Sequence, residues 1–172
     1  NILGETEAGV KITRRDAKIQ PETVIYDPDL TMSLPKALAA SSAMNAIAHA
    51  VEALYAKDGN PVISLMAEEG IRALAMAGAD REKALYGAWL CGSVLGAASM
   101  ALHHKLCHVL GGSFNLPHSE THAVVLPHAA AYNAAAAPDA MARIARALAE
   151  AVHGLGRAGR RRDAARRRDS CC

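Results

Sequence analysis

Apolar residues recur at helical spacing through most of the chain, from residue 35 to about residue 150. Capping and turn residues divide this region, among them Asp80 and the Pro61 that sits at a tolerated first-turn position. The predicted helices cover residues 35–40, 42–56, 61–77, 81–98, a segment around 104–108, 118–133, and a last segment that starts at Pro138. The pattern predicts a mainly α protein built as a helical bundle.

Strand character is limited to the first 30 residues. Residues 4–13 predict a turn or one arm of a hairpin, and the β-branched run 22–27 predicts a short strand that Pro28 stops. No GxGxxG or Walker phosphate loop is found in the sequence. The chain opens with Asn1 rather than Met, so we expect it to be a piece of a longer protein.

Composition supports close helix packing. Hydrophobic residues make up 51% of the 172 residues but aromatic residues only 3%, so the core must be built largely from Ala, Leu, Val, Ile and Met. Small residues in the 81–98 helix, including Gly87 and Gly92, favour close approach of a neighbouring helix.

No run of about 18 apolar residues lacks polar breaks, and no cleavable leader is found. We expect no membrane partner and a cytoplasmic location.

Charge separates the end of the chain from the rest. Residues 157–172 hold seven Arg and two Asp, a net charge of +5, whereas the whole chain carries +2, so the preceding part is mildly acidic. Segment 154–172 has one Leu and no aromatic residue, which predicts a disordered basic tail. Such a tail could bind nucleic acid or an acidic surface, or it could be an out-of-frame read of GC-rich DNA. The four cysteines (Cys91, Cys107, Cys171 and Cys172) show neither disulfide nor Cys-x-x-Cys metal spacing.

Histidines gather in one stretch, since residues 101–118 hold four of the eight in the chain. His104 and His108 are four apart and therefore share a helix face. Gly111 and Gly112 predict the end of that helix. The loop that follows can fold back and bring His118 toward the pair, and converging imidazoles form either a metal site or an acid–base site.

A second polar face lies on the 42–56 helix, where Asn45 and His49 are also four apart among apolar residues. Polar side chains on such a helix are costly to bury unless they are paired. We therefore expect the two helices to meet across one pocket lined by Asn45, His49 and the His104 group. His103 points elsewhere on its helix and is expected to be packed or at the surface.

Three motifs at compatible spacings carry a resemblance to a known family. They are Asn-Ala-Ile-Ala-His-Ala-Val-Glu-Ala from residue 45, His-His-Lys-Leu-Cys-His-Val-Leu-Gly-Gly from 103, and Leu-Pro-His-Ser-Glu-Thr-His-Ala-Val-Val-Leu-Pro-His from 116. Over residues 1–150 the chain resembles the iron-containing alcohol dehydrogenases, and within them most of all the maleylacetate reductases of aromatic catabolism. The resemblance implies the dehydroquinate synthase-like fold of that family.

The resemblance also implies a domain organisation. Residues 1–30 would be the remnant of a nucleotide-binding α/β domain, and 31–153 the helical domain that holds the substrate or metal site. The family's glycine-rich pyrophosphate loop lies upstream of such a segment. The implied cofactor is NADH or NADPH, the implied partner is a small-molecule substrate rather than nucleic acid, and the full-length protein is expected to be a homodimer. Because segment 154–172 departs from the family where further helices should follow, the out-of-frame interpretation is favoured there.

Residue by residue, His49, His104 and His118 fall on the family's three histidine metal ligands. Asn45 falls where the metal-dependent members have aspartate, and an uncharged amide is a poor ligand for Fe(II) or Zn(II). The resemblance therefore implies a metal-independent reduction of the maleylacetate double bond, giving 3-oxoadipate. His108 and His118, together with His104, are the predicted catalytic residues, which stabilise the enolate oxygen and deliver a proton.

Two other interpretations stay open from the sequence. A metal-dependent alcohol dehydrogenase would use His49, His104 and His118 to hold a cation that polarises a carbonyl. Alternatively, the polypeptide is an inactive fragment with half an active site and no cofactor domain.

Overall fold

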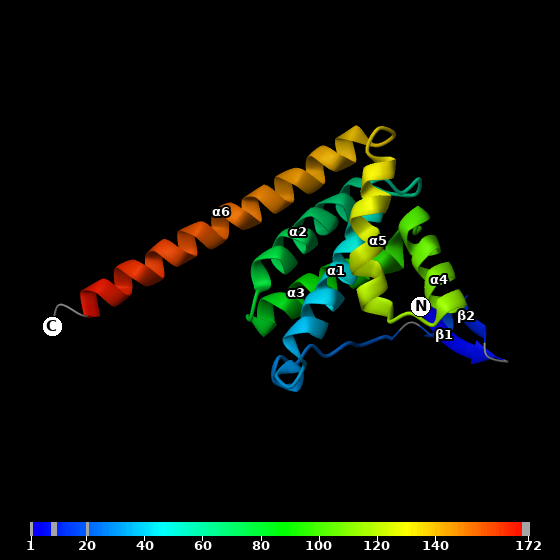
Figure 1. Ribbon diagram of the computed structural model, residues 1–172, viewed down its shortest axis with the longest axis horizontal. Coiled ribbons are helices and arrows are strands. Elements are labelled where there is room, and N and C mark those ends of the chain that lie inside the picture. The colour runs from blue at the N-terminus through cyan, green and yellow to red at the C-terminus, as the bar shows by residue number, and fades with distance from the viewer. Residues whose placement is uncertain (1, 8–9, 20, 170–172) are drawn as a thin grey trace.

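The structure is a computed structural model that describes residues 2–7, 10–19 and 21–169. Its helices are α1 (Lys36–Ala53), α2 (Pro61–Ala77), α3 (Arg81–Ala97), α4 (Leu102–Phe114), α5 (His118–Asn133) and α6 (Pro138–Asp169). Two strands, β1 (Ile2–Glu7) and β2 (Val10–Arg15), and two 3₁₀ turns, η1 (Ala17–Ile19) and η2 (Asp29–Thr31), precede them. Figure 1 shows the helices gathered into one bundle, so the mainly α prediction is confirmed.

Local capping signals placed the starts of α2 and α3 correctly. The Asn60 side chain accepts a hydrogen bond from the backbone N–H of Ile63 at 3.0 Å, and Pro61 occupies the first helical position. Asp80 accepts from the backbone N–H of Lys83 at 3.0 Å in the same way. These side chains satisfy backbone donors that have no partner inside the first helical turn.

Two boundaries differ from the sequence prediction. The predicted helices 35–40 and 42–56 are one helix, α1, in which Ser41 does not interrupt the backbone and its hydroxyl donates to the Leu38 carbonyl at 3.2 Å. The predicted stop at Gly111 and Gly112 is wrong, because α4 continues through both. It ends at Phe114, and the next residue, Asn115, takes the left-handed conformation (φ 50°). Asparagine tolerates this conformation better than most side chains, so glycine was not required for the turn.

The N-terminal prediction was right for the hairpin and wrong for the second strand. β1 and β2 pair antiparallel from Ile2↔Arg15 to Glu7↔Val10, and this hairpin is the one sheet in the described part of the chain. Residues 23–27 have no strand conformation, and Ile25 is 86% exposed. β-branched composition alone does not make a strand, because an extended segment needs a partner for its backbone hydrogen bonds.

The core lies around α1, which contacts α2, α3 and α5. The C-terminal half of α1 is buried (Ile47, Ala48, Ala50, Val51, Glu52 and Ala53). α2 and α3 approach closely at two glycines. A Cβ added at Gly70 would lie 2.7 Å from Cys91 Sγ, and one at Gly87 would lie 2.6 Å from Leu74 Cγ. The prediction of a close approach is therefore confirmed at Gly87. It is wrong at Gly92, where an added Cβ would meet no described atom within 4 Å.

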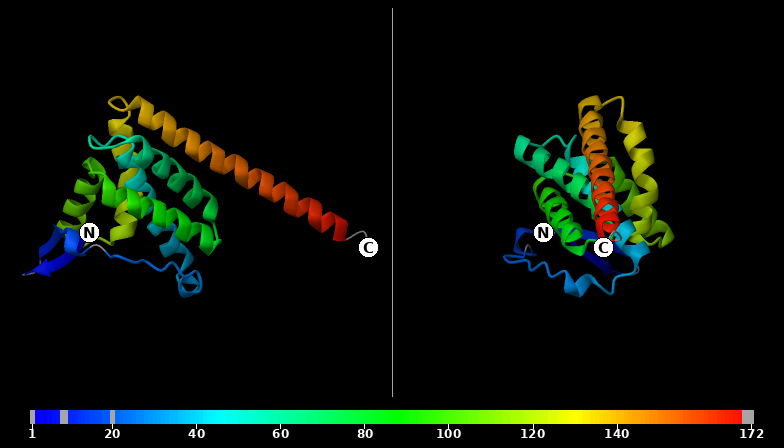
Figure 2. Two further views of the ribbon diagram at one scale, coloured as in Figure 1. Left: turned by 180° about the vertical axis from the view of Figure 1, so that it is seen from behind. Right: turned by 90° about the vertical axis from the view of Figure 1, so that its left-hand side faces the viewer.

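The predicted disordered tail is wrong for residues 154–169, since α6 is helical through Asp169. Alanine and arginine are strong helix formers and no proline follows Pro138, so the segment can continue as a helix despite its three glycines. The first part of α6 packs on α2, where Arg143 pairs with Glu68 and Gly154 lies against Met76. Beyond this contact the red half of α6 extends away from the bundle (Figures 1 and 2). Residues 170–172 lie outside the described residues.

Among the described residues, no single helix is both long enough and apolar enough to cross a membrane. α3 and α4 satisfy both only when taken together, and they are bent by 97° at the break between them.

Candidate active site: histidines around a buried carboxylate

Six imidazole rings from three helices form one continuous cluster. His49 comes from α1, His103, His104 and His108 from α4, and His118 and His122 from α5. The His49 and His104 rings are stacked with centroids 4.7 Å apart, so the two polar helix faces meet as the spacing predicted. His108 lies 6.3 Å from His104 and 6.4 Å from His118, centroid to centroid.

Exposure changes along the cluster. His104 is 5% exposed, whereas His108 and His118 are solvent-exposed. The predicted catalytic residues therefore form a path from the interior to the surface. His49 and Asn45 are partly buried on α1, and the Asn45 Oδ1 atom has no hydrogen-bond partner among the described residues.

Glu52 is a central residue of the site that sequence reasoning missed. It is fully buried on α1, three residues after His49 and thus on the same helix face. Its carboxylate accepts the backbone N–H groups of Ala101 (2.9 Å) and His103 (2.7 Å), and it lies 2.6 Å from Nδ1 of His104. It thereby caps the N-terminus of α4 from another helix. A buried Glu on an apolar helix was the signal that could have revealed it.

The Glu52 carboxyl is ionised at neutral pH. Burial raises its pKa, but the hydrogen bond from His104 and those from the Ala101 and His103 backbone lower it, and the net direction is down. Because a carboxylate only accepts, the proton on the neutral His104 ring lies on Nδ1. The opposite nitrogen, Nε2, is buried and has no hydrogen-bond partner among the described residues. His104 therefore presents a bare Nε2 lone pair.

Three other rings are held neutral. Burial, followed by repulsion from neighbouring imidazoles, lowers the pKa of His49 to about 3 and that of His122 to about 2. The pKa of His103 falls to about 4 for the same reasons, burial first. We call His49, His103 and His122 the low-pKa rings. Glu52 contacts His104 directly, with 2.6 Å between the carboxylate oxygen Oε2 and Nδ1 of the ring.

His103 is packed inside the protein, which is one of the two alternatives that the sequence predicted for it. It is fully buried, and its Nε2 lies 2.9 Å from Nδ1 of His122, which is also fully buried. Cys107, one turn along α4, places its Sγ 3.7 Å from the same His103 nitrogen. These three side chains offer ligand atoms within 4.8 Å of one another and could hold a metal ion. The i, i+4 spacings of 103/107 and 118/122 were the available signal.

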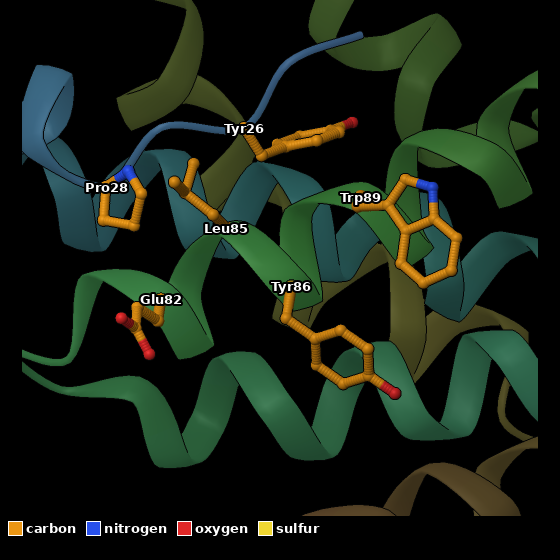
Figure 3. Close-up of a pocket in the computed structure, with 6 residues that line it drawn as sticks. All are labelled: Tyr26, Pro28, Glu82, Leu85, Tyr86 and Trp89. Carbon is orange, nitrogen blue, oxygen red and sulfur yellow. The ribbon is translucent and has the colours of Figure 1, made fainter.

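A surface pocket lies apart from this chemistry. Its volume is about 330 Å³. Figure 3 shows Tyr26 and Pro28 of the N-terminal segment facing α3 across it. Its other lining residues are Glu82, Leu85, Tyr86 and Trp89, so aromatic groups dominate and one carboxylate is present. None of its lining residues belongs to the histidine cluster.

Comparison with known proteins identifies the family of this domain. Residues 39–168 match the C-terminal domain of the Fe-containing alcohol dehydrogenase family. This chain belongs to the iron-containing alcohol dehydrogenase family. The match contains all six clustered rings and extends into the basic segment of α6. The mainly α domain that carries the histidine cluster is thus the C-terminal domain of this family.

Individual relatives are named as one enzyme within this family. The chain is 65% identical over 157 residues to maleylacetate reductase of Burkholderia cepacia, covering 86% of this chain and 45% of that protein. It is 61% identical over 157 residues to the enzyme of that name from Sphingobium indicum, with the same coverages. The crystal structure of maleylacetate reductase from a Rhizobium species superposes with a TM-score of 0.81 at 52% identity, covering 90% of this chain and 49% of that one. The chain thus spans about half the length of the relatives it matches.

The family name implies iron, and the residues that the sequence resemblance assigned to the family's ligand positions do not fit it. His49, His104 and His118 are neutral donors, and Asn45 adds an uncharged amide whose Oδ1 is buried without a partner among the described residues. Fe(II) and Zn(II) sites of this type gain affinity from an anionic ligand. The one carboxylate at the cluster, Glu52, is engaged by Nδ1 of His104 and two backbone N–H groups. We therefore derive no reaction step through a metal at this position.

Proposed function

We propose that the protein to which this chain belongs is a maleylacetate reductase, which reduces the carbon–carbon double bond of maleylacetate with NADH or NADPH to give 3-oxoadipate. The identities of 65% and 61% to enzymes of that name support the substrate. The observation that carries the chemistry is the path of rings from Glu52–His104 in the interior to His108 and His118 at the surface.

The reaction adds two hydrogens in different forms. The nicotinamide supplies a hydride when bound, and the hydride adds to an alkene carbon conjugated with the substrate ketone. Negative charge then develops on the ketone oxygen as an enolate, and a proton must reach the adjacent carbon. The side chains described here have two tasks, to stabilise the oxygen charge and to supply the proton.

The environment of each ring suits a different task. His108 and His118 are exposed and can exchange protons with solvent, so we assign proton delivery to this pair. His104 is buried, and its Nδ1 lies 2.6 Å from the Glu52 carboxylate. We assign the stabilisation of the enolate oxygen to the doubly protonated form of His104, in which Nε2–H can donate to that oxygen. His49 stays neutral because its pKa is about 3, and it packs on the face of His104 to hold that ring in place.

Turnover in a completed enzyme tests this assignment. The 172-residue chain alone is expected to be inactive with maleylacetate and NADH, because no glycine-rich cofactor loop is found in its sequence. A chimera that joins this chain to the portions of the Burkholderia cepacia enzyme outside the matched region should oxidise NADH. In that chimera His118→Ala should lower kcat by roughly 10²–10⁴-fold, the range of a lost proton donor.

The matched control is His128→Ala, an exposed histidine on the same helix that does not belong to the cluster. It should leave kcat within about twofold. Equal activity of the His118→Ala and unaltered chimeras would show that another group delivers the proton. A chimera that folds but does not accept maleylacetate would refute the proposed substrate.

A further inference from the structure

His103, Cys107 and His122 form a polar group inside the α4–α5 interface that the proposed reduction does not use. They are 0%, 2% and 0% exposed, respectively. His103 and Cys107 lie one turn apart on α4, and His122 projects from α5, which packs against α4. Two imidazoles and a thiol thus converge from two helices into one dry space.

The donor set suits a thiophilic divalent cation. Histidine nitrogen and cysteine sulfur are the usual ligands of zinc, at about 2.0–2.3 Å. In a tetrahedron these lengths place neighbouring ligand atoms roughly 3.3–3.8 Å apart. The Cys107 Sγ to His103 Nε2 distance of 3.7 Å falls in this range. The His103 Nε2 to His122 Nδ1 distance of 2.9 Å needs to open by a few tenths of an ångström.

Packing between α4 and α5 does not satisfy all the polar atoms of these three side chains. The hydrogen bond between the two rings satisfies one nitrogen of each, but Nε2 of His122 is buried with no partner among the described residues. The thiol makes long contacts of 3.7 and 3.9 Å to His103. Unsatisfied polar groups in an apolar interior are costly, and a cation offers them a strong partner.

We propose that His103, Cys107 and one of the two His122 nitrogens bind a zinc-type divalent cation. Binding displaces the thiol proton, so the cation gains a thiolate ligand and one proton leaves to solvent. The thiolate supplies the anionic ligand that Asn45 denies to the family's own metal position.

This site has a structural consequence for the cluster. The His103 ring centroid lies 5.0 Å from that of His104, and His122 lies 4.4 Å from His118. A cation shared by α4 and α5 would fix the two helices that carry these rings. The proposal does not depend on the proposed reduction, since it concerns residues with no assigned step.

Cobalt is the probe that distinguishes this site from the family position, because only this one contains sulfur. The measurement uses the full 172-residue chain with Cys171→Ser and Cys172→Ser, so that the terminal thiols do not bind the ion. Titration of the metal-free protein with Co(II) should produce one thiolate-to-cobalt charge-transfer band at one equivalent. Zinc should then displace cobalt and abolish the band.

Substitutions test which residues give rise to the charge-transfer band. Cys107→Ser should abolish it and His122→Gln should weaken cobalt binding at least about tenfold, the usual cost of losing a ligand-site group. Cys91→Ser, which alters the other buried free thiol, should leave the band unchanged, as should Asn45→Ala. No band, or a band that survives Cys107→Ser, overturns the proposal.

A second measurement needs no substitution at the site and covers the case in which Cys107→Ser does not fold. X-ray absorption of the zinc-loaded chain should show one sulfur among the zinc ligands. A shell of nitrogen and oxygen only would overturn the proposal, and it would place the ion at the family position. Neither result bears on maleylacetate turnover, so failure here leaves the proposed function to its own test.

Discussion

Removing the Glu52 carboxylate should destabilise the domain more than any surface change. Glu52→Ala leaves the backbone N–H groups of Ala101 and His103 and the Nδ1–H of His104 without their acceptor, all inside the protein. Each buried donor left unpaired costs about 1–3 kcal/mol. We therefore expect Glu52→Ala to lower the free energy of unfolding by about 3–5 kcal/mol, the cost measured when one partner of a buried charge pair is removed.

Glu52→Gln separates charge from shape. Glutamine keeps the volume and one acceptor oxygen, which can serve Ala101 and His104 together as Oε2 does now. One donor, the His103 N–H, then loses its partner, so we expect a cost of about 1–3 kcal/mol. The amide also removes the negative charge beside Nδ1 of His104. In the chimera the variant should therefore lower kcat while KM for maleylacetate changes little.

Urea unfolding of the 172-residue chain, followed by circular dichroism at pH 7, measures the stability losses. The control is Glu120→Ala, an exposed glutamate in the first turn of α5, which should cost no more than about 0.5 kcal/mol. A Glu52→Ala loss equal to that of Glu120→Ala would refute the view that this carboxylate organises the cluster.

Four further outcomes follow from the packing and charges. The metal-free chain should lose stability as pH falls below 6.5, because the low-pKa rings bind protons when unfolded but stay neutral when folded until pH about 2–4. The slope of stability, from urea midpoints between pH 7 and 5, should reach up to about 4 kcal/mol per pH unit, and a flat profile would contradict the neutral rings. Asn45→Asp should raise zinc affinity at the family position, measured by calorimetry in a Cys107→Ala background, and unchanged affinity would show that charge is not what that position lacks. Gly87→Ala should destabilise by about 1–3 kcal/mol because its Cβ would lie 3.1 Å from a backbone nitrogen, whereas Gly92→Ala, with no described atom within 4 Å, should stabilise by up to about 1 kcal/mol. Deleting residues 156–172 should leave the thermal midpoint within about 2 °C, since the α6 contact with α2 is retained at Gly154, and a larger drop would show that the deleted turns contribute.

The sequence alone determined the features that depend on neighbours along the chain. Asn60 with Pro61, and Asp80, specify helix starts because their caps bond within the next three residues. The i, i+4 spacings of Asn45/His49 and His104/His108 place each pair on one helix face, whatever that face meets. From these local rules the bundle and most of the histidine cluster could be predicted.

Only the tertiary structure decided which side chains contact one another across helices. Glu52 could have been an ordinary helix-surface glutamate. Its role arises because α1 meets the start of α4, 49 to 52 residues further along the chain. His103 and His122 likewise become hydrogen-bond partners only because α4 packs on α5. Spacing along one helix specifies a direction but not the partner found there, and the partner sets the charge, protonation and burial on which chemistry depends.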